Sequence, residues 1–496
     1  MRLFVTLLLL ASAAVAQQTP APHWAFYRDE VHQIKITFSQ SNWFEKLTKD
    51  YTDNDDVPYT EAAIEWGPYS FKSAGIRFKG NSSYNGATTQ KKPFRIKLNE
   101  FVKGQKIDGI ASFNLSNGWN DPSMIRETVY YNIASWAGFT APRSNFAALT
   151  INGKYWGLYV LGEIVNGDFL SSRFPKDDKG NLYKAEIGAT LEDRGDDPAS
   201  YKEMFEKQSN EDKDDWSDIV QLATTLSRTP IESLADKMDA MLDVDSVLAG
   251  MAIDNLTVNL DSYIGQMAQN YFIYRRPSDN RFVWILYDPS LAFGAFNSGM
   301  TVEQMKQLSP AWTAASSGQM PGGGTPPQLP PDTPAPPNTP RPPDTPVPPG
   351  FSQRPGGGGQ RPLFTRLMEV PKYRERYGQI YRWLVSEFLS ADMVATRMNV
   401  LHQMVRPWLE RDTQKLNTIE EFSKALTEDQ TLAAGSRPGG VNPTPPADPN
   451  LPPGFEPRGG GGMGMSPGLQ PFFRDRLDWV RTQVKLNSDG SWGVTP

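Results

Sequence analysis

The stretch Gly75-Ile76-Arg77-Phe78-Lys79-Gly80-Asn81-Ser82-Ser83 alternates apolar and basic side chains and then ends in a small polar turn. A period of two predicts a β-strand that carries Arg77 and Lys79 on one face. Backbone N–H groups in such a turn can approach a phosphate. An edge strand with solvated cations explains the same pattern, so this stretch alone leaves both interpretations open.

A second basic stretch, Lys91–Leu98, repeats the alternation. Its apolar residues are expected to face the core, which leaves Arg95 and Lys97 on the opposite face. If the two strands pair, four cations meet on one face of a sheet. Like charges gather at an energetic cost that a bound polyanion would offset. A solvated outer face remains the alternative.

Two aspartates have informative positions. Asp254 and Asp261 are seven residues apart, so both can lie on one helix face near its end. The apolar run before Asp288 predicts a strand that ends in a carboxylate and is followed by a turn at Gly294. Metal-binding carboxylates often occupy strand ends, although helix capping for Asp261 and turn formation for Asp288 explain the same residues.

The order of elements indicates an α+β fold. Asp121-Pro122-Ser123 predicts the start of a helix, and Asn152-Gly153 predicts a β-hairpin. Residues 244–259 predict a second helix, and residues 270–274 and 282–287 predict a strand pair. A strand-rich first half followed by a helix-rich second half is typical of an α+β domain.

Two segments, 318–362 and 436–470, consist largely of proline and glycine. Such segments bury too little apolar surface to offset their ordering entropy, so they are expected to be disordered or polyproline loops. Helical patterns resume after each. We therefore predict one domain over residues 31–484 with two insertions, preceded by a leader at 17–30 and followed by a tail at 485–496.

Residues 1–16 combine one basic residue, a short apolar run and an Ala-x-Ala-like end. This pattern predicts a signal peptide and a secreted, extracellular protein that is wall-associated in one interpretation. No later stretch is apolar enough to predict a membrane span. Export also makes the Asn-x-Ser/Thr sequons at Asn81, Asn114 and Asn255 candidates for glycosylation, but Asn81 and Asn255 lie near the motifs considered functional and are not expected to carry a glycan.

Composition excludes several classes of chemistry. The chain has no cysteine and three histidines, which disfavours thiolate zinc sites, cysteine nucleophiles and most serine hydrolases. With a net charge of −6 and no basic tract, nucleic-acid binding is not expected. Carboxylates, lysines and arginines remain, and these suit phosphoryl transfer with Mg²⁺, although paired carboxylates also leave a glycosidase open.

Taken in order, ten stretches between about Val31 and Val484 resemble the CotH kinase family, the spore-coat-protein-H type. Each is a weak signal alone, whereas their order makes the signal strong. The stretches are Gly75–Ser83, Lys91–Leu98, Asp121-Pro122-Ser123 with Arg126-Glu127, Gly138–Arg143, Asn152–Tyr159, Gly162-Glu163, Asn181–Lys184, Asn259–Tyr263, Asn270–Phe272 and Tyr287–Gly294.

The resemblance implies a remote protein-kinase-like fold and an ATP- and Mg²⁺-dependent atypical protein kinase. The implied protein substrates carry the accepting Ser or Thr and are exported, coat or wall proteins. By resemblance, Asp261 is the catalytic aspartate and Asp288 the metal-binding one, and both carboxylates are expected at the metal. The candidate phosphate-binding residues are Arg77, Lys79, Lys92, Arg95 and Lys97.

Two features qualify this assignment. The family often has a second acidic residue two positions after the metal aspartate, where this chain has Ser290. Glu163 fits either an ion pair or a contact on the adenine side. A surface adhesin on a kinase-like scaffold, as in related fungal invasins, is the main alternative, and a carbohydrate-active enzyme is a weaker one.

Overall fold

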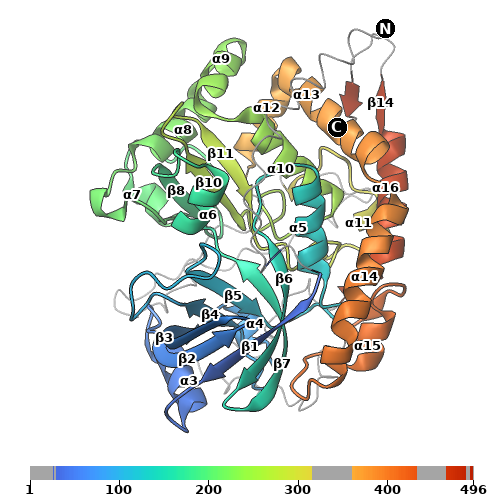
Figure 1. Ribbon diagram of the computed structural model, residues 1–496. Coiled ribbons are helices and arrows are strands. Elements are labelled where there is room, and N and C mark those ends of the chain that lie inside the picture. The colour runs from blue at the N-terminus through green and yellow to red at the C-terminus, as the bar shows by residue number, and fades with distance from the viewer. Residues whose placement is uncertain (1–25, 27–28, 315–359, 433–464, 487–491, 495–496) are drawn as a thin grey trace, which may run out of the picture.

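The computed structural model describes residues 26, 29–314, 360–432, 465–486 and 492–494 (Figure 1). A barrel dominates the first half, and helices around a second sheet dominate the second half, so the α+β prediction is confirmed. The predicted signal peptide, most of the leader and most of both Pro/Gly-rich segments lie outside the described residues. Residues 360–362 and 465–470, at the ends of those segments, lie in the described fold.

The barrel is closed, with neighbouring strands in the order β1-β2-β3-β4-β5-β7-β6. Parallel pairing of β1 with β6 closes it, and its other strand pairs are antiparallel. Alternation fills the interior, because side chains such as Ile34, Ile76 and Phe78 are at most 1 % exposed. Each such side chain contributes about 1.5–3 kcal/mol by leaving water. The strands are β1 Val31–Thr37, β2 Thr60–Trp66, β3 Tyr69–Phe78, β4 Phe94–Lys97, β5 Ser112–Ser116, β6 Ser144–Ile151 and β7 Lys154–Glu163.

The hairpin predicted at Asn152-Gly153 joins β6 to β7. Both residues have positive φ, 47° and 80°, as a two-residue turn between twisted strands requires. The Asn152 side chain also accepts a hydrogen bond from the Phe38 backbone N–H at 2.8 Å. This contact ties the hairpin to the end of β1.

A second sheet has the order β11-β10-β8-β9. It contains the predicted strand pair, with Tyr271 opposite Leu286 in antiparallel register. Apolar side chains on this sheet pack with the helices into the largest core of the described residues. The strands are β8 Asn181–Ala185, β9 Phe205–Lys207, β10 Tyr271–Arg275 and β11 Phe282–Leu286.

Helix α5, Arg126–Trp136, contacts β6 of the barrel and the long helix α14 (Figure 1). The predicted start at Asp121 is wrong by five residues, because Asn120 and Met124 take left-handed backbone conformations. Asp121 still serves the helix, since its carboxylate accepts a hydrogen bond from the Arg126 backbone N–H at 3.0 Å.

Helix α10, Val244–Leu256, runs beside the second sheet and ends before the predicted boundary at Asn259. The Thr257 hydroxyl donates back to the Ile253 carbonyl at 2.7 Å, and Val258 has a φ of 50°. Asp261 therefore lies on the turn beyond the helix. The prediction that Asp254 and Asp261 share one helix face is wrong.

Two long helices, α14 and α16, run along one side of the molecule, and α14 also contacts the barrel at β7. Within the residues described, no helix has the length and apolarity needed to cross a membrane. The remaining elements are α3 Trp43–Asp53, α4 Ser82–Asn85, α6 Gly167–Arg173, α7 Ala199–Lys202, α8 Ser217–Arg228, α9 Ile231–Met241, α11 Val302–Lys306, α12 Pro362–Glu369, α13 Pro371–Arg382, α14 Ala391–Glu410, α15 Ile419–Lys424, α16 Leu469–Gln483, η1 Glu211–Lys213, η3 Trp383–Phe388, β12 Gln430–Thr431, β13 Met465–Ser466, β14 Val484–Leu486 and β15 Trp492–Val494.

Candidate functional site

The two basic strands pair as expected. In the ladder between β3 and β4, Arg77 lies opposite Arg95 and Gly75 lies opposite Lys97. Lys79 follows β3 directly, and its backbone N–H donates to the Pro93 carbonyl at 3.1 Å. Since the intervening apolar residues point into the barrel, these cations lie on its outer face.

Several of these cations have partners inside the protein. Arg77 donates to the Val57 carbonyl at 2.7 Å and lies over the Tyr59 ring. Lys97 forms an ion pair with Glu100 at 2.6 Å. The structure thus engages Arg77 and Lys97 in contacts on the outer face of the barrel.

Lys92 belongs to the loop before β4. Its amine donates to the Tyr84 carbonyl at 2.8 Å and to the Ala87 carbonyl at 3.0 Å. Burial lowers the pKa of Lys92. These contacts hold the loop in its shape.

Arg95 and Asn114 are neighbours across β4 and β5. Among the described residues, the Arg95 Nε and the Asn114 Oδ1 are buried atoms without a hydrogen-bond partner. Unsatisfied buried polar atoms are uncommon and call for a reason, such as a missing ligand. This part of the outer face therefore has capacity for a polar ligand.

Glu127, in the first turn of α5, reaches the same region. A Cβ added at Gly162 on β7 would lie 3.4 Å from the Glu127 Oε1, so the carboxyl packs on a strand position without a side chain. Burial and the nearby charge of Asp288 raise the pKa of Glu127 to about 8, and Lys79 opposes this shift. Lys79 and Asp288 are thus each within electrostatic reach of Glu127.

Asp288 directly follows Tyr287 at the end of β11 and has a φ of 43°. Its backbone N–H donates to the Tyr131 hydroxyl at 3.0 Å, which links it to α5. Its carboxylate accepts a hydrogen bond from the Ser290 hydroxyl at 2.8 Å. Ser290, which replaces the expected acidic residue, therefore contacts the carboxylate itself.

Asp261 lies on the turn after α10. Its carboxylate accepts hydrogen bonds from the Gln269 amide at 2.8 Å and the Asn270 amide at 2.9 Å. Burial raises the pKa of Asp261 to about 7, and the charge of Asp288 contributes to this rise. Asp288 is thus close enough to influence the ionisation of Asp261.

Backbone strain gathers around these aspartates. Val258, Asp288 and Phe293 all have positive φ, at 50°, 43° and 55°. A β-branched residue such as Val258 rarely adopts this conformation. The Phe293 N–H donates to the Thr257 carbonyl at 2.6 Å, which joins the two strained segments. Strain of this kind is characteristic of functional sites.

The acidic set suits Mg²⁺ in one specific way. Within the described part of the chain, no group of three or more His, Cys, Asp or Glu residues could hold a metal by itself. Mg²⁺ usually takes one or two carboxylates and completes its shell with substrate phosphates and water. Asp261 and Asp288 could supply two carboxylates, and a cation would relieve the repulsion from Asp288 that adds to the effect of burial on the pKa of Asp261.

Glu163 has a structural setting. It is 5 % exposed and forms ion pairs with Arg143 and with Arg173, the latter at 2.8 Å. Burial opposes its ionisation, but Arg173 and Arg143 together hold its pKa below the ordinary value. Of the two roles considered for Glu163, an ion pair or a contact on the adenine side, the structure shows the ion pair.

The predicted sequons differ in access. Asn114 and Asn255 are 6 % and 2 % exposed, so neither accepts a glycan in the folded protein. Asn81, just before α4, is exposed. Glycosylation of the folded chain is therefore restricted to Asn81 among the three.

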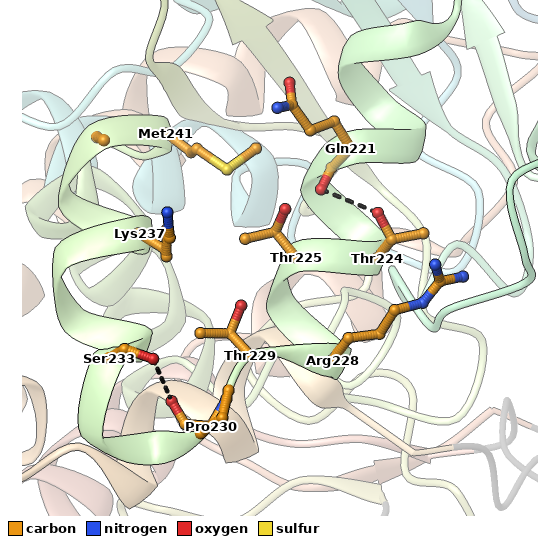
Figure 2. Close-up of a pocket in the computed structure, with 10 residues that line it drawn as sticks. Gln221, Thr224, Thr225, Arg228, Thr229, Pro230, Ser233, Lys237 and Met241 are labelled. Carbon is orange, nitrogen blue, oxygen red and sulfur yellow. Dashed lines mark hydrogen bonds between the residues drawn. The ribbon is translucent and has the colours of Figure 1, made fainter.

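A cavity lies elsewhere, between α8 and α9 (Figure 2). This groove of about 620 Å³ is lined by hydroxyl-bearing residues such as Thr225, Thr229 and Ser233. Arg228 at its edge forms ion pairs with Asp193 and Asp196. None of the residues that approach Asp261 or Asp288 lines this groove.

Sequence reasoning missed Glu127 as a site residue. Its signal was present, because Arg126-Glu127 is one of the stretches that resemble the CotH kinase family. Its meaning needed the position of α5, which places residues 127 and 131 of one helix face next to Asp288.

Comparison with known proteins finds relatives of this chain. The chain is 21 % identical to "Inner spore coat protein H" of Bacillus subtilis (strain 168) over 392 residues, covering 76 % of this chain and 88 % of that protein. It is 27 % identical to "Invasin CotH2" of Rhizopus delemar over 185 residues, 36 % of this chain and 30 % of that protein. It is 26 % identical to "Invasin CotH3" of the same fungus over 229 residues, 44 % of this chain and 37 % of that protein. The family model described as "CotH kinase protein" matches residues 76–433, and the chain therefore belongs to the CotH kinase family.

Proposed function

We propose that this protein is an ATP- and Mg²⁺-dependent atypical protein kinase with a remote protein-kinase-like fold. One observation carries the proposal. Four charged residues from separate elements form a chain of electrostatic neighbours. Glu127 on α5 is within electrostatic reach of Lys79 at the barrel and of Asp288 after β11. Asp288 in turn is within electrostatic reach of Asp261 after α10. A cation and carboxylates from separate elements are what phosphoryl transfer needs.

Each of these residues has a distinct role in the proposal. Lys79 binds phosphate oxygens, and Glu127 orients its amine by charge attraction. Asp288, held by the Tyr131 hydroxyl, and Asp261 hold Mg²⁺. Asp261 also orients the attacking hydroxyl of a Ser or Thr and accepts its proton.

Bound Mg²⁺ would neutralise charge on the phosphates. The chain's own groups then decide orientation and proton transfer. A carboxyl with a pKa of about 7 suits proton acceptance near neutral pH. Arg95 and Asn114, whose Nε and Oδ1 atoms lack partners in the described structure, are proposed to contact the nucleotide.

The direct test incubates the protein with labelled ATP, Mg²⁺ and a Ser-rich acceptor protein, and measures transfer and nucleotide binding separately. Asp288→Asn should weaken the Mg²⁺ dependence of binding, because an amide is a poorer ligand for a hard cation. Asp261→Asn should spare binding and lower turnover at least about 100-fold. Two variants that both behave like the wild type would refute the assigned roles.

A surface adhesin or invasin with weak or no catalysis is the second candidate. The observation that favours it is the Ser290 hydroxyl on Asp288, where the family often has a further acidic ligand. Two of the relatives are named invasins. Thermal stabilisation by Mg²⁺-ATP separates the candidates, since a nucleotide site must raise the melting temperature by mass action. Absence of both stabilisation and transfer would favour the adhesin.

We further propose that the protein acts outside the cell, on coat, wall or surface proteins. The relatives' names, spore coat protein and invasin, support this location. The predicted signal peptide at residues 1–16 supports it independently. Secretion can be tested by expressing the full chain and sequencing the N-terminus of the exported product, which should begin after Ala16.

A further inference from the structure

Tyr130 and Asp254 form a buried pair beside the candidate site. The Tyr130 hydroxyl on α5 donates to the Asp254 Oδ1 on α10 at 2.6 Å. The two residues are 1 % and 2 % exposed. A buried carboxylate is costly, and an apolar pair of similar size would usually be as stable. A need other than stability therefore accounts for this pair.

Asp254 continues the connection towards Asp261. The Asn259 side-chain amide donates to the same Asp254 Oδ1 at 2.9 Å, and the Asn259 backbone N–H donates to the Asp254 carbonyl at 2.8 Å. Asn259 is fully buried and lies two residues before Asp261. Val258, which has a positive φ, lies between the end of α10 and Asn259. Asp254 thus holds the turn on which Asp261 is placed.

The same helix also holds the other aspartate. One residue after Tyr130, the Tyr131 hydroxyl accepts the Asp288 backbone N–H at 3.0 Å. Adjacent side chains of α5 therefore fix the two segments that carry Asp261 and Asp288. A single helix so positioned can set their separation.

We propose that Tyr130 and Asp254 are positioning residues that act through Asn259 to place Asp261 for phosphoryl transfer. This inference rests on the proposed kinase function. Tyr130 touches neither nucleotide nor acceptor in this scheme. Its effect belongs mainly to the chemical step, because the proton-accepting role of Asp261 begins when the hydroxyl attacks, whereas Lys79 and Asp288 contribute most of the nucleotide affinity.

The chain offers a matched control. In the second sheet, the buried Tyr183 hydroxyl donates to the Asp218 carboxylate at 2.5 Å. Tyr130→Phe and Tyr183→Phe delete the same kind of hydrogen bond from the same kind of pair. A purely structural role predicts the same outcome for both variants: a small loss of melting temperature and unchanged turnover.

The experiment compares kcat, the KM for ATP and the melting temperature of wild type, Tyr130→Phe and Tyr183→Phe. Tyr130→Phe should lower kcat about 10- to 100-fold, as displaced catalytic geometry does, with the KM for ATP within twofold. Tyr183→Phe should keep kcat within twofold at a similar loss of melting temperature. Equal kcat values for the two variants would overturn the proposal.

A second variant tests the route. Asn259→Ala removes the side-chain link from the Asp254 carboxylate to the turn, while the backbone hydrogen bond between these residues and the Tyr130–Asp254 bond remain. If Tyr130 acts through Asn259, the double variant Tyr130→Phe/Asn259→Ala should lose no more kcat than Asn259→Ala alone. If the fold-losses in kcat of the two single variants multiply in the double variant, Tyr130 does not act through Asn259. A wild-type protein that transfers no phosphate would overturn the proposed function and this inference together, whereas an active wild type with an unaffected Tyr130→Phe would overturn only the inference.

Discussion

A lysine and a carboxylate approach each other at two places beside the barrel, and the protein satisfies these two sets to different degrees. Lys91 lies 2.6 Å from Asp412, both side chains are fully buried, and the Leu158 N–H donates to the same carboxylate at 3.0 Å. Gly157 has a φ of 141°, and a Cβ there would lie 2.5 Å from Asp412. Lys79 and Glu127, in contrast, are partly buried, and the pKa of Glu127 is raised.

The difference separates a buried ion pair that holds the fold, Lys91–Asp412, from charged residues that are proposed to bind a substrate, Lys79 and Glu127. Around Asp412, backbone N–H groups and an amine complete the hydrogen bonding, so nothing is left for a ligand. Around Glu127, burial and then the neighbouring Asp288 carboxylate raise the pKa, so a bound cation would stabilise the ionised carboxylates. The first pair joins the segment after α14 to the barrel, whereas the second set belongs to the proposed substrate site.

The largest expected effect breaks the structural pair. Lys91→Met leaves the Asp412 carboxylate buried without its ion-pair partner, which costs about 3–5 kcal/mol. The melting temperature should fall by roughly 5 °C or more. The double variant Lys91→Met/Asp412→Leu removes both charges and should recover part of the loss. A Lys91→Met variant as stable as the wild type would contradict the structural assignment.

Changing Lys79 should weaken ligand binding and leave stability nearly unchanged, in contrast to the change of Lys91. Lys79→Met removes a charge-assisted contact to phosphate, so the Kd for Mg²⁺-ATP should rise about 10- to 100-fold. The melting temperature without ligand should change by less than about 2 °C, because the side chain is not fully buried. Isothermal titration measures the first quantity and thermal unfolding the second. Lys35→Met, at an exposed pair with Glu65, is the control that should alter neither.

The raised pKa of Glu127 predicts a pH effect on the ligand-free protein. Its pKa is raised from 4.5 to about 8, so between these values the folded state keeps a proton that the unfolded chain has released. The contribution of Glu127 to the free energy of unfolding is therefore fully present below pH 4.5 and is lost as the pH rises to about 8. Asp254 and Asp261, whose burial raises their pKa values to about 7, add to this fall.

Glu127→Gln cannot ionise and should flatten that fall. Its melting temperature should nearly equal that of the wild type at pH 5 and exceed it by roughly 2–4 °C at pH 9. Glu65→Gln, at an exposed position, is the matched control and should follow the wild type at both values. A wild-type melting temperature that rises from pH 5 to pH 8 in step with both variants would contradict the raised pKa.

The smallest effects are expected at Arg77 and Lys97. Both have partners on the outer face, namely the Val57 carbonyl and Glu100. Lys97→Ala should shift stability by no more than about 0.5 kcal/mol, and the Kd for Mg²⁺-ATP should stay within twofold. A tenfold weaker affinity in Lys97→Ala would return Lys97 to the phosphate site and shift the proposed site along the β3–β4 ladder.

The sequence predicted the local parts of this fold well. Alternation placed Ile76 and Phe78 inside and Arg77 outside, and the left-handed tolerance of Asn152-Gly153 identified the hairpin. These signals are local, because strand period and turn chemistry act within a few residues. Asp288 was found for the same reason, as a carboxylate that ends an apolar strand.

The remaining features depend on contacts between distant segments. Nothing near Lys91 indicates that Asp412 neutralises it, because α14 comes to the barrel only in the folded chain. Likewise, Glu127 looks like an ordinary acidic residue in a first helical turn until α5 is placed beside Asp288. The end of α10 was missed because Thr257 and Asn259 bond back to the helix and stop it early.

The parallel pairing of β1 with β6 has a consequence for how the barrel forms. Val31 pairs with Phe146, so the first strand cannot find this neighbour until most of the barrel sequence is present. Pairings so distant in the chain form slowly, because the loop must close before the contacts stabilise it. Until then β1 has one open edge, and its outward residues, including Gln33 and Lys35, are polar. Polar and charged edges discourage pairing with the wrong chain, which protects a slowly closing barrel from aggregation.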